Sequence, residues 1–418
     1  MKGYDIIIIG GGPAGLAASI SAFDSGVKNV LIIERENELG GILNQCIHNG
    51  FGLARFKESL TGPEYAEKFI IEVKKRNINY LTNTTVISVG SDKTVTAING
   101  ENGVFTLKAK SIIFAMGCRE RSRGAINVAG TRPSGVYSAG TAQKYVNILG
   151  YMPGKSVVIL GSGDIGLIMA RRMTLEGAKV HAVIEIMPYS SGLKRNIVQC
   201  LDDFDIPLYL NHTITEIKGE DRVTGVTVSR VDENRKPIKG TEIEFNCDTV
   251  LFSVGLIPEN ELSKQMGVEL SNSTKGAIVT QDRQTNIEGV FVCGNVLQVH
   301  DLVDFVSEEA EIAGKASANY VLNGKRENKI INTLCKNGVS YVLPQKLDLN
   351  GEDDVLLFFR VNKVFKNCTV KVVCGDKVVV SKRKKICVPG EMETVLISKD
   401  KLKSLSQDVG VLVEGDEL

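Results

Sequence analysis

The sequence predicts an α/β protein with two strand–helix–strand units of the same kind, followed by a small β-rich domain. Three observations predict this fold. An apolar run, a glycine-rich turn and a helical pattern follow one another over residues 4–35, and the same order recurs from residue 155. From residue 331 onward the chain changes to short valine-rich strands and lysine-rich turns. Alternating strands and helices are typical of parallel sheets, whereas consecutive short strands indicate a separate β domain.

The first glycine-rich turn has the G-x-G-x-x-G spacing. Gly10, Gly12 and Gly15 follow the apolar run 6–9, and the next apolar run ends at Glu34, about 20 residues after the glycines. In this motif the first glycine makes a tight turn, the second lets the backbone approach a pyrophosphate, and the third lets helix pack on strand. The helix N-terminus faces the phosphates and the acid bonds a ribose hydroxyl. This turn therefore predicts a dinucleotide site.

The same motif recurs at residues 161–166, after the apolar run 157–160, and its second apolar run ends at Glu185. Glu185 would accept hydrogen bonds from both ribose hydroxyls of NAD and would repel a 2′-phosphate. The nearest following arginine is Arg195, so we expect NAD(H) to be preferred over NADP(H). Two dinucleotide sites in one chain predict electron transfer between them. The residues expected at the second site are Gly161, Gly163, Asp164, Ile165, Gly166 and Glu185.

Composition excludes several classes of protein. The 418 residues carry a net charge of +1 with both signs interspersed, which favours neither nucleic acid nor an anionic membrane surface as a partner. No apolar run approaches the roughly 18 residues of a membrane span. The first strand begins by residue 5, which leaves no room for a signal peptide, so a cytoplasmic location is expected. The nine cysteines include no C-x-x-C pair, and we expect no metal site.

Between the two units, helical periodicity predicts a helix over 64–76 that starts at the turn 61–63. Alternating strands follow over 79–107, and a buried strand is expected over 111–117. The stretch 118–153 is rich in glycine, arginine and proline and predicts a crossover between domains.

After the second unit, strands are predicted over 223–228 and 243–252. A late strand over 289–295 precedes a helix over 304–322. In the C-terminal domain, no strong helix is expected before 399–404.

Together these features resemble the pyridine nucleotide–disulfide oxidoreductase superfamily, whose members carry two dinucleotide domains. The resemblance implies FAD at the first turn and a nicotinamide nucleotide at the second, with the second domain inserted into the first. The stretches that carry it are 10–15 with Glu34, 114–117, 161–166, 255–260 and 290–295. The implied domains are 1–120 (FAD-binding, first part), 121–255 (NAD-binding), 256–330 (FAD-binding, second part) and 331–418 (β-rich).

The resemblance also implies roles for single residues along FAD. Asn295 departs from the family, whose carboxylate at this position usually bonds a ribitol hydroxyl; an amide can do so with one charge fewer. The helix that begins near Asp304 would direct its N-terminus at the flavin and stabilise its reduced, anionic form. The implied contacts are Gly10, Gly12, Pro13, Ala14 and Gly15 for the pyrophosphate, Glu34 and Arg35 for the adenosine ribose, Gly41 and Gln45 for the flavin loop, Val86 for adenine, Gly117 beside the dinucleotide, Gly255 at the return crossover, and Gly294 and Asn295 for the ribitol phosphate.

The chain departs from the disulfide reductases of this superfamily at their redox centre. Those enzymes carry two cysteines, whereas the loop 38–52 holds only Cys46, with His48 two residues on. The reductases also supply a C-terminal histidine, but no histidine follows His300. We therefore do not expect disulfide reduction. Two interpretations of Cys46 stay open: a catalytic thiolate whose pKa His48 lowers, or a small buried packing residue. His48 is likewise either a proton carrier or a packing residue.

Three stretches, 45–53, 60–66 and 118–124, resemble the flavoprotein subunits that accompany FAD-dependent dehydrogenases of glycerol 3-phosphate, proline, opines and amines. This implies hydride transfer between NADH and FAD, with electrons passing to or from a partner dehydrogenase subunit. One alternative is a stand-alone NADH oxidase or peroxidase that uses Cys46. Another is a flavin-bound scaffold subunit without catalysis. The β domain is assigned to docking, with homodimerisation as the alternative.

Overall fold

The computed structural model describes residues 2–417. Residues 1 and 418, the outermost positions of the first and last predicted domains, lie outside the described residues. The chain forms two compact units. The first comprises Met1–Asn44, Asn49–Cys118 and Pro258–Leu418, and the second comprises Gln45–His48 and Arg119–Ile257. The predicted class, α/β with a β-rich C-terminal region, is confirmed.

The first unit is built on a seven-stranded sheet with the order β5-β2-β1-β8-β7-β6, in which β20 also pairs with β8. Strands β1 (Lys2–Ile9), β2 (Val30–Ile33), β8 (Gly103–Phe114) and β20 (Val290–Val292) run parallel. The remaining strands are β5 (Asn79–Leu81), β6 (Thr85–Val89) and β7 (Thr94–Asn99), of which β6 and β7 pair antiparallel.

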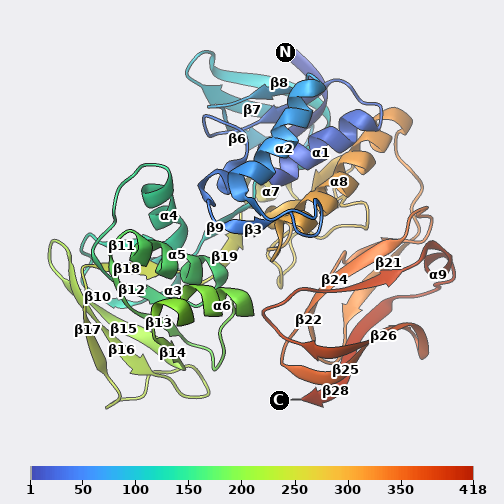
Figure 1. Ribbon diagram of the computed structural model, residues 1–418. Coiled ribbons are helices and arrows are strands. Elements are labelled where there is room, and N and C mark those ends of the chain that lie inside the picture. The colour runs from blue at the N-terminus through green and yellow to red at the C-terminus, as the bar shows by residue number, and fades with distance from the viewer. Residues whose placement is uncertain (1, 418) are drawn as a thin grey trace. The chain divides into compact units, whose positions relative to one another are not determined.

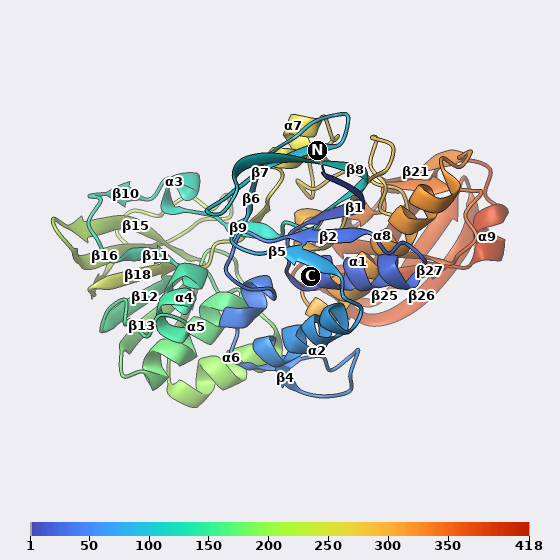
Figure 2. The ribbon, with the colours of Figure 1, turned by 90° about the horizontal axis from the view of Figure 1, so that it is seen from above.

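Both faces of this sheet are covered, which explains its unbroken apolar strands. On β1, Ile6 and Ile8 lie in a buried cluster on one face, and Ile7 and Ile9 lie in a second cluster on the other. Parallel strands that are buried on both faces read as continuous hydrophobic runs. Figure 2 shows α1 and α2 on one side of β1 and β2 and α7 on the opposite side. The helices are α1 (Pro13–Asp24), α2 (Gly62–Lys75) and α8 (Val303–Asn323) on the first face and α7 (Glu261–Met266) on the second.

The second unit contains a parallel five-stranded sheet with the order β11-β18-β12-β13-β14. A second sheet, β10-β15-β16-β17, lies in the same unit (Figure 1). Its helices are α4 (Ala139–Asn147), α5 (Asp164–Leu175) and α6 (Lys194–Cys200). The strands are β10 (Ala129–Gly130), β11 (Val136–Ser138), β12 (Ser156–Leu160), β13 (Lys179–Glu185), β14 (Leu208–Leu210), β15 (His212–Gly219), β16 (Val223–Arg230), β17 (Ile243–Asn246) and β18 (Thr249–Phe252).

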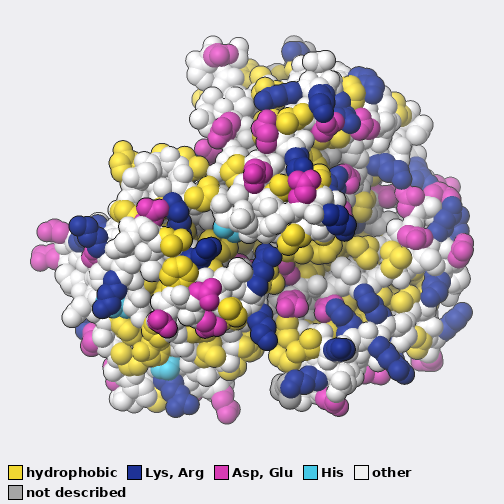
Figure 3. All heavy atoms as spheres, in the orientation of Figure 1, with side chains coloured by type: hydrophobic (Ala, Val, Ile, Leu, Met, Phe, Trp, Pro, Cys, Tyr) yellow, Lys and Arg dark blue, Asp and Glu magenta, His cyan; other side chains and the backbone are white. Residues whose placement is uncertain are grey.

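The C-terminal region forms two sheets around its own apolar core, β23-β21-β28-β25-β26 and β22-β24-β27. Lysine and arginine side chains gather over β25 and β26 on the face seen in Figure 3. The elements are β21 (Ile330–Cys335), β22 (Val339–Leu343), β23 (Lys346–Asp348), β24 (Val355–Val361), β25 (Phe365–Cys374), β26 (Lys377–Cys387), β27 (Glu393–Ile397), α9 (Lys399–Lys403) and β28 (Val409–Glu417).

Short elements connect these parts, and the chain passes from the first unit to the second at β9 and returns at β19. Within residues 2–417, no helix is both long enough and apolar enough to cross a membrane. The connecting elements are η1 (Gly41–Gln45), β3 (Asn49–Phe51), β4 (Leu60–Thr61), β9 (Cys118–Glu120), α3 (Arg123–Ile126), η2 (Asp202–Phe204), β19 (Leu256–Pro258) and η3 (Gly294–Val296).

Helix α2 begins with a capping box. Thr61 accepts a hydrogen bond from the backbone N–H of Glu64 through its hydroxyl, at 3.4 Å, and the Glu64 carboxylate accepts one from the Thr61 N–H at 2.8 Å. Pro63 follows in the first turn, where its missing N–H needs no partner. The predicted helix therefore starts two residues earlier than expected, because the turn residues 62 and 63 are already helical.

We expect Thr61→Ala to lower the free energy of unfolding by about 1 kcal/mol, because the Glu64 N–H at the start of α2 loses its side-chain acceptor. Denaturant unfolding followed by circular dichroism measures the change. Thr61→Ser keeps the hydroxyl and should stay close to wild type. An equal loss of stability in both variants would contradict the capping argument.

Candidate functional site

In the turn between β1 and α1, the packing of the protein requires glycine at two positions and leaves a third open. Gly10 has φ +110°, and a Cβ on Gly15 would lie 1.8 Å from the carbonyl oxygen of Gly10. Gly12 differs, because a Cβ there would meet only the Cα of Gly41, at 3.8 Å. Protein packing therefore does not require glycine at position 12, whereas the approach of a pyrophosphate does. The open space beside Gly12 is consistent with the dinucleotide site that the motif predicts.

Separate segments of the first unit meet at this turn. A Cβ on Gly41 would lie 2.9 Å from the Cα of Gly12, and a Cβ on Gly294 would lie 2.7 Å from the Cβ of Ala14. Gly10 approaches the Ala115 backbone, two residues before Gly117. The structure thus brings three of the predicted FAD segments, and the end of the strand before Gly117, to the N-terminus of α1. Pro13 occupies the first turn of this helix.

Glu34 is held where β2 ends. One carboxylate oxygen accepts a hydrogen bond from the Gly11 N–H at 2.6 Å, and the other accepts one from the Glu36 N–H at 2.9 Å. The residue is only 6% exposed. A carboxylate has about four lone-pair sites, so acceptor capacity remains for a ribose hydroxyl. Among the other predicted contacts, Arg35 is exposed and Val86 lies half-buried on β6.

The second turn repeats this construction. Gly161 has φ +101°, and a Cβ on Gly166 would lie 2.5 Å from the Gly161 carbonyl oxygen. A Cβ on Gly163 would meet nothing closer than two serine hydroxyls at 3.7 Å. Glu185 accepts hydrogen bonds from the Ser162 N–H and hydroxyl, at 3.0 and 2.6 Å, and from the Met187 N–H at 2.9 Å. The second turn therefore has the same open middle position and the same anchored acid.

Asp164 begins α5 and binds the loop that follows β13. Its carboxylate accepts hydrogen bonds from the Leu193 N–H at 2.8 Å and from the Asn196 amide at 2.6 Å. Ile165 is half-buried against the apolar core of the second unit. Gly255 follows β18, and its carbonyl accepts a hydrogen bond from the Arg121 N–H at 3.0 Å. These contacts shape the loops around the second turn.

Residues 45–48 belong to the second unit, although their neighbours belong to the first. The Gln45 side chain donates hydrogen bonds to the Gly140 carbonyl and the Gln143 side chain, both at 2.9 Å. Asn147 donates to the Gln45 carbonyl at 2.8 Å, and the Cys46 sulfur lies 3.8 Å from the Gln143 side-chain oxygen. This short segment is therefore fastened to helix α4.

The surroundings of Cys46 and His48 favour their neutral forms. Burial raises the pKa of the Cys46 thiol to about 12. Burial, with the positive charges of Arg195 and Arg171, lowers the pKa of His48 to about 4. The two side chains do not form the thiolate–imidazolium pair that activates a catalytic cysteine. The packing interpretation of Cys46 gains support, and the catalytic assignments of Cys46 and His48 stay predictions.

Sequence reasoning missed a buried charged cluster beside Gly294. Glu309 on α8 accepts a hydrogen bond from the Gly294 N–H at 3.0 Å and lies 2.9 Å from His300 Nε2. Arg283 Nε donates to Glu309 at 3.1 Å. No signal in the sequence pointed to it, because Arg283 and Glu309 both lie in segments rich in other polar and charged residues (280–288 and 304–311).

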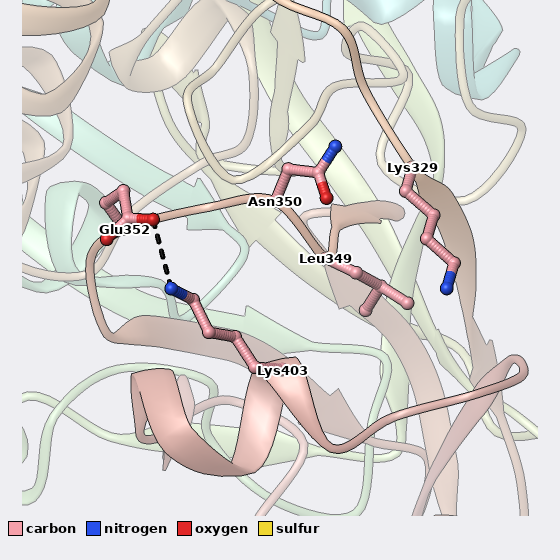
Figure 4. A pocket seen from close by; sticks show the side chains of 5 residues that line it. All are labelled: Lys329, Leu349, Asn350, Glu352 and Lys403. Carbon is pink, nitrogen blue, oxygen red and sulfur yellow. Dashed lines mark hydrogen bonds and ion pairs between the residues drawn. The ribbon is translucent and has the colours of Figure 1, made fainter.

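Two other features of the described residues bear on function. Residues 2–417 contain no group of three or more His, Cys, Asp or Glu side chains arranged to hold a metal ion. A surface pocket of the C-terminal region contains the ion pair between Glu352 and Lys403, at 3.0 Å (Figure 4). Glu352 also pairs with Lys399, so its charge is already matched, and we assign the pocket no chemistry. Its lining residues are Lys329, Leu349, Asn350, Glu352 and Lys403.

Comparison with known proteins agrees with this geometry. The profile of the pyridine nucleotide-disulphide oxidoreductase family matches residues 4–317. Hydrogen cyanide synthase subunit HcnB of Pseudomonas protegens is 27% identical over 65% of this chain and 60% of its own length. An opine oxidase subunit of Agrobacterium tumefaciens is 24% identical over 75% of this chain and 64% of its own length. The chain thus spans about three-fifths of these curated relatives.

Solved structures show the same fold. Thioredoxin reductase of T. acidophilum is 25% identical and aligns over 77% of this chain and 98% of its own, with a TM-score of 0.61. An NAD-dependent persulfide reductase from A. fulgidus is 18% identical and aligns over 88% of this chain and 67% of its own, with a TM-score of 0.57. The match over residues 4–317 agrees with the two glycine turns and the acids bonded to them. The chain belongs to the pyridine nucleotide-disulphide oxidoreductase family, whose members bind FAD.

Proposed function

We propose that this protein transfers a hydride between NADH and FAD, with FAD at the first turn and NADH at the second. The observation that carries the proposal is the presence of two turns in which Gly12 and Gly163 leave room that protein packing does not fill. FAD supplies a two-electron acceptor that exchanges a hydride with a nicotinamide.

The chain's own residues supply binding and orientation. The N-termini of α1 and α5 direct backbone N–H groups at the two pyrophosphates. Glu34 and Glu185, already fixed by backbone donors, accept hydrogen bonds from the adenosine riboses. The negative charge of Glu185 disfavours a 2′-phosphate, so the preferred nucleotide is NADH.

We further propose that the electrons pass to or from a partner dehydrogenase subunit. Two curated relatives are named as subunits, one of hydrogen cyanide synthase and one of opine oxidase. The loop offers a single cysteine, Cys46, and burial keeps it protonated, which leaves no dithiol relay. The exposed lysines and arginines of β25 and β26 make the C-terminal region our candidate for docking (Figure 3). We place the reaction in the cytoplasm, where free cysteines such as these are usual.

Gly12→Val should abolish FAD binding while leaving the protein folded, because valine fills only the open space beside Gly41. Flavin absorbance of the purified variant measures occupancy. Gly163→Val is the matched control, since it should keep FAD and lose reduction by NADH. Full FAD occupancy in Gly12→Val would contradict the assignment of the first turn.

NADH should reduce the bound flavin faster than NADPH, and Glu185→Ala should narrow the difference because it removes the charge that repels a 2′-phosphate. Stopped-flow bleaching of the flavin gives both rates. Glu185→Gln removes the charge but keeps a hydrogen-bond acceptor for Ser162. It therefore shows whether the change in preference comes from the lost charge or from a loosened turn. A wild-type protein that prefers NADPH would overturn the argument.

The protein alone, given NADH, should reduce an artificial dye but neither a disulfide nor a peroxide. With one protonated cysteine, reduced flavin has no thiol relay and transfers electrons directly to the dye. Steady-state assays with the three acceptors test this, with Cys46→Ser as the comparison. Rapid peroxide turnover that disappears in Cys46→Ser would instead favour the stand-alone peroxidase.

A further inference from the structure

A fully buried cluster of charges lies behind the turn that is expected to contact the ribitol phosphate. Glu309 is 0% exposed and Arg283 is 1% exposed, and the His300 side chain is equally buried. Burial alone raises the pKa of a carboxyl, but His300, Arg283 and the Gly294 N–H outweigh this and hold the pKa of Glu309 below its usual value. Charges buried this deeply persist only where their partners are fixed.

Glu309 connects this cluster to both predicted flavin contacts of η3. Its carboxylate accepts the Gly294 N–H at 3.0 Å and meets His300 Nε2 at 2.9 Å. The backbone N–H of His300 in turn donates to the Asn295 side-chain oxygen at 3.0 Å. One side chain on α8 therefore fixes the conformation of the whole segment from Gly294 to His300.

The C-terminal region holds the other side of the same segment. The ring of Phe358, on β24, meets the His300 ring edge to face at 5.8 Å. Arg360, two residues further on β24, forms an ion pair with Asp301. The Met392 N–H donates to the same Asp301 carboxylate at 2.7 Å. Strand β24 and the segment around Met392 thus contact two adjacent residues, His300 and Asp301.

We propose that the C-terminal β region is part of the flavin site, with Arg360 and Phe358 as positioning residues. They hold His300 and Asp301, and through Glu309 they hold the Gly294–Asn295 turn in the conformation that binds FAD. The inference rests on FAD occupying the first turn.

The test is titration of FAD into deflavinated protein, followed by flavin fluorescence. Arg360→Gln should weaken FAD binding about tenfold, because it removes the ion pair with Asp301 and the hydrogen bonds that Arg360 donates to the Val299 and Gly390 carbonyls. Arg360→Lys keeps the charge beside Asp301 and should restore much of the affinity. Phe358→Leu, which removes the ring that packs on His300, Phe305 and Arg283, should weaken binding and shift the absorption spectrum of the bound flavin. The matched control is Lys371→Gln, which breaks the pair between Lys371 and Glu414 in the same region, away from the turn, and should bind FAD like wild type.

Thermal unfolding of each deflavinated variant separates positioning from general instability. Folded Arg360→Gln and Phe358→Leu proteins with wild-type affinity and spectrum would overturn the inference. Weakened binding in Lys371→Gln to the same extent would also overturn it, since the effect would then be general. Absence of FAD binding by the wild-type protein would contradict the proposed function. Loss of the expected difference between the variants would contradict only this inference.

Discussion

A carboxylate hydrogen-bonded to the backbone of a glycine turn is the interaction on which both proposed nucleotide sites depend. Glu34 draws the Gly11 N–H toward the end of β2, and Glu185 does the same for Ser162 at the end of β13. Each bond fixes the turn against its sheet just before the helix, α1 or α5, begins. The acids are therefore structural in the first place, and their remaining lone pairs are available to the riboses that we propose they bind.

At the first site, a buried cluster of side chains outside the glycine motif also constrains the Gly294–Asn295 turn. Glu309 forms a buried ion pair with Arg283 and a hydrogen bond with His300 inside the α8 face of the sheet, and replacing Arg283 would leave Glu309 buried without its charged partner. Such a network contributes little net stability, but it specifies one conformation of the Gly294–Asn295 turn. The contacts of Phe358 and Arg360 extend this specification into the C-terminal region.

Local patterns in the sequence predicted much of the fold. The continuous apolar runs gave the buried parallel strands, and the turn before Pro63 gave the start of α2 to within two residues. The helix expected over 304–322 is α8, Val303–Asn323. Two expected strands, ending at 107 and starting at 111, form the single strand β8, because no glycine or proline interrupts the chain between them. Glycine spacing likewise gave the turns at Gly12 and Gly163.

The remaining features depend on contacts between distant residues, which leave no local pattern. Arg283 and Glu309 are 26 positions apart, and Asp301 and Arg360 are 59 apart. The attachment of Gln45 to α4 spans 98 positions, and it decides the environment of Cys46. From the sequence, Cys46 and His48 looked like a possible reactive pair because they are neighbours in the chain. Burial instead keeps the Cys46 thiol protonated, and burial together with Arg195 and Arg171 keeps His48 neutral.

Anaerobic titration of the purified protein with NADH tests the central claim most directly. If FAD and NADH occupy the two turns and exchange a hydride, the protein is yellow, and roughly one equivalent of NADH removes its flavin absorbance. A flavin that stays oxidised in excess NADH, yet is bleached by a chemical reductant, would contradict the account and favour a flavin-bound scaffold subunit.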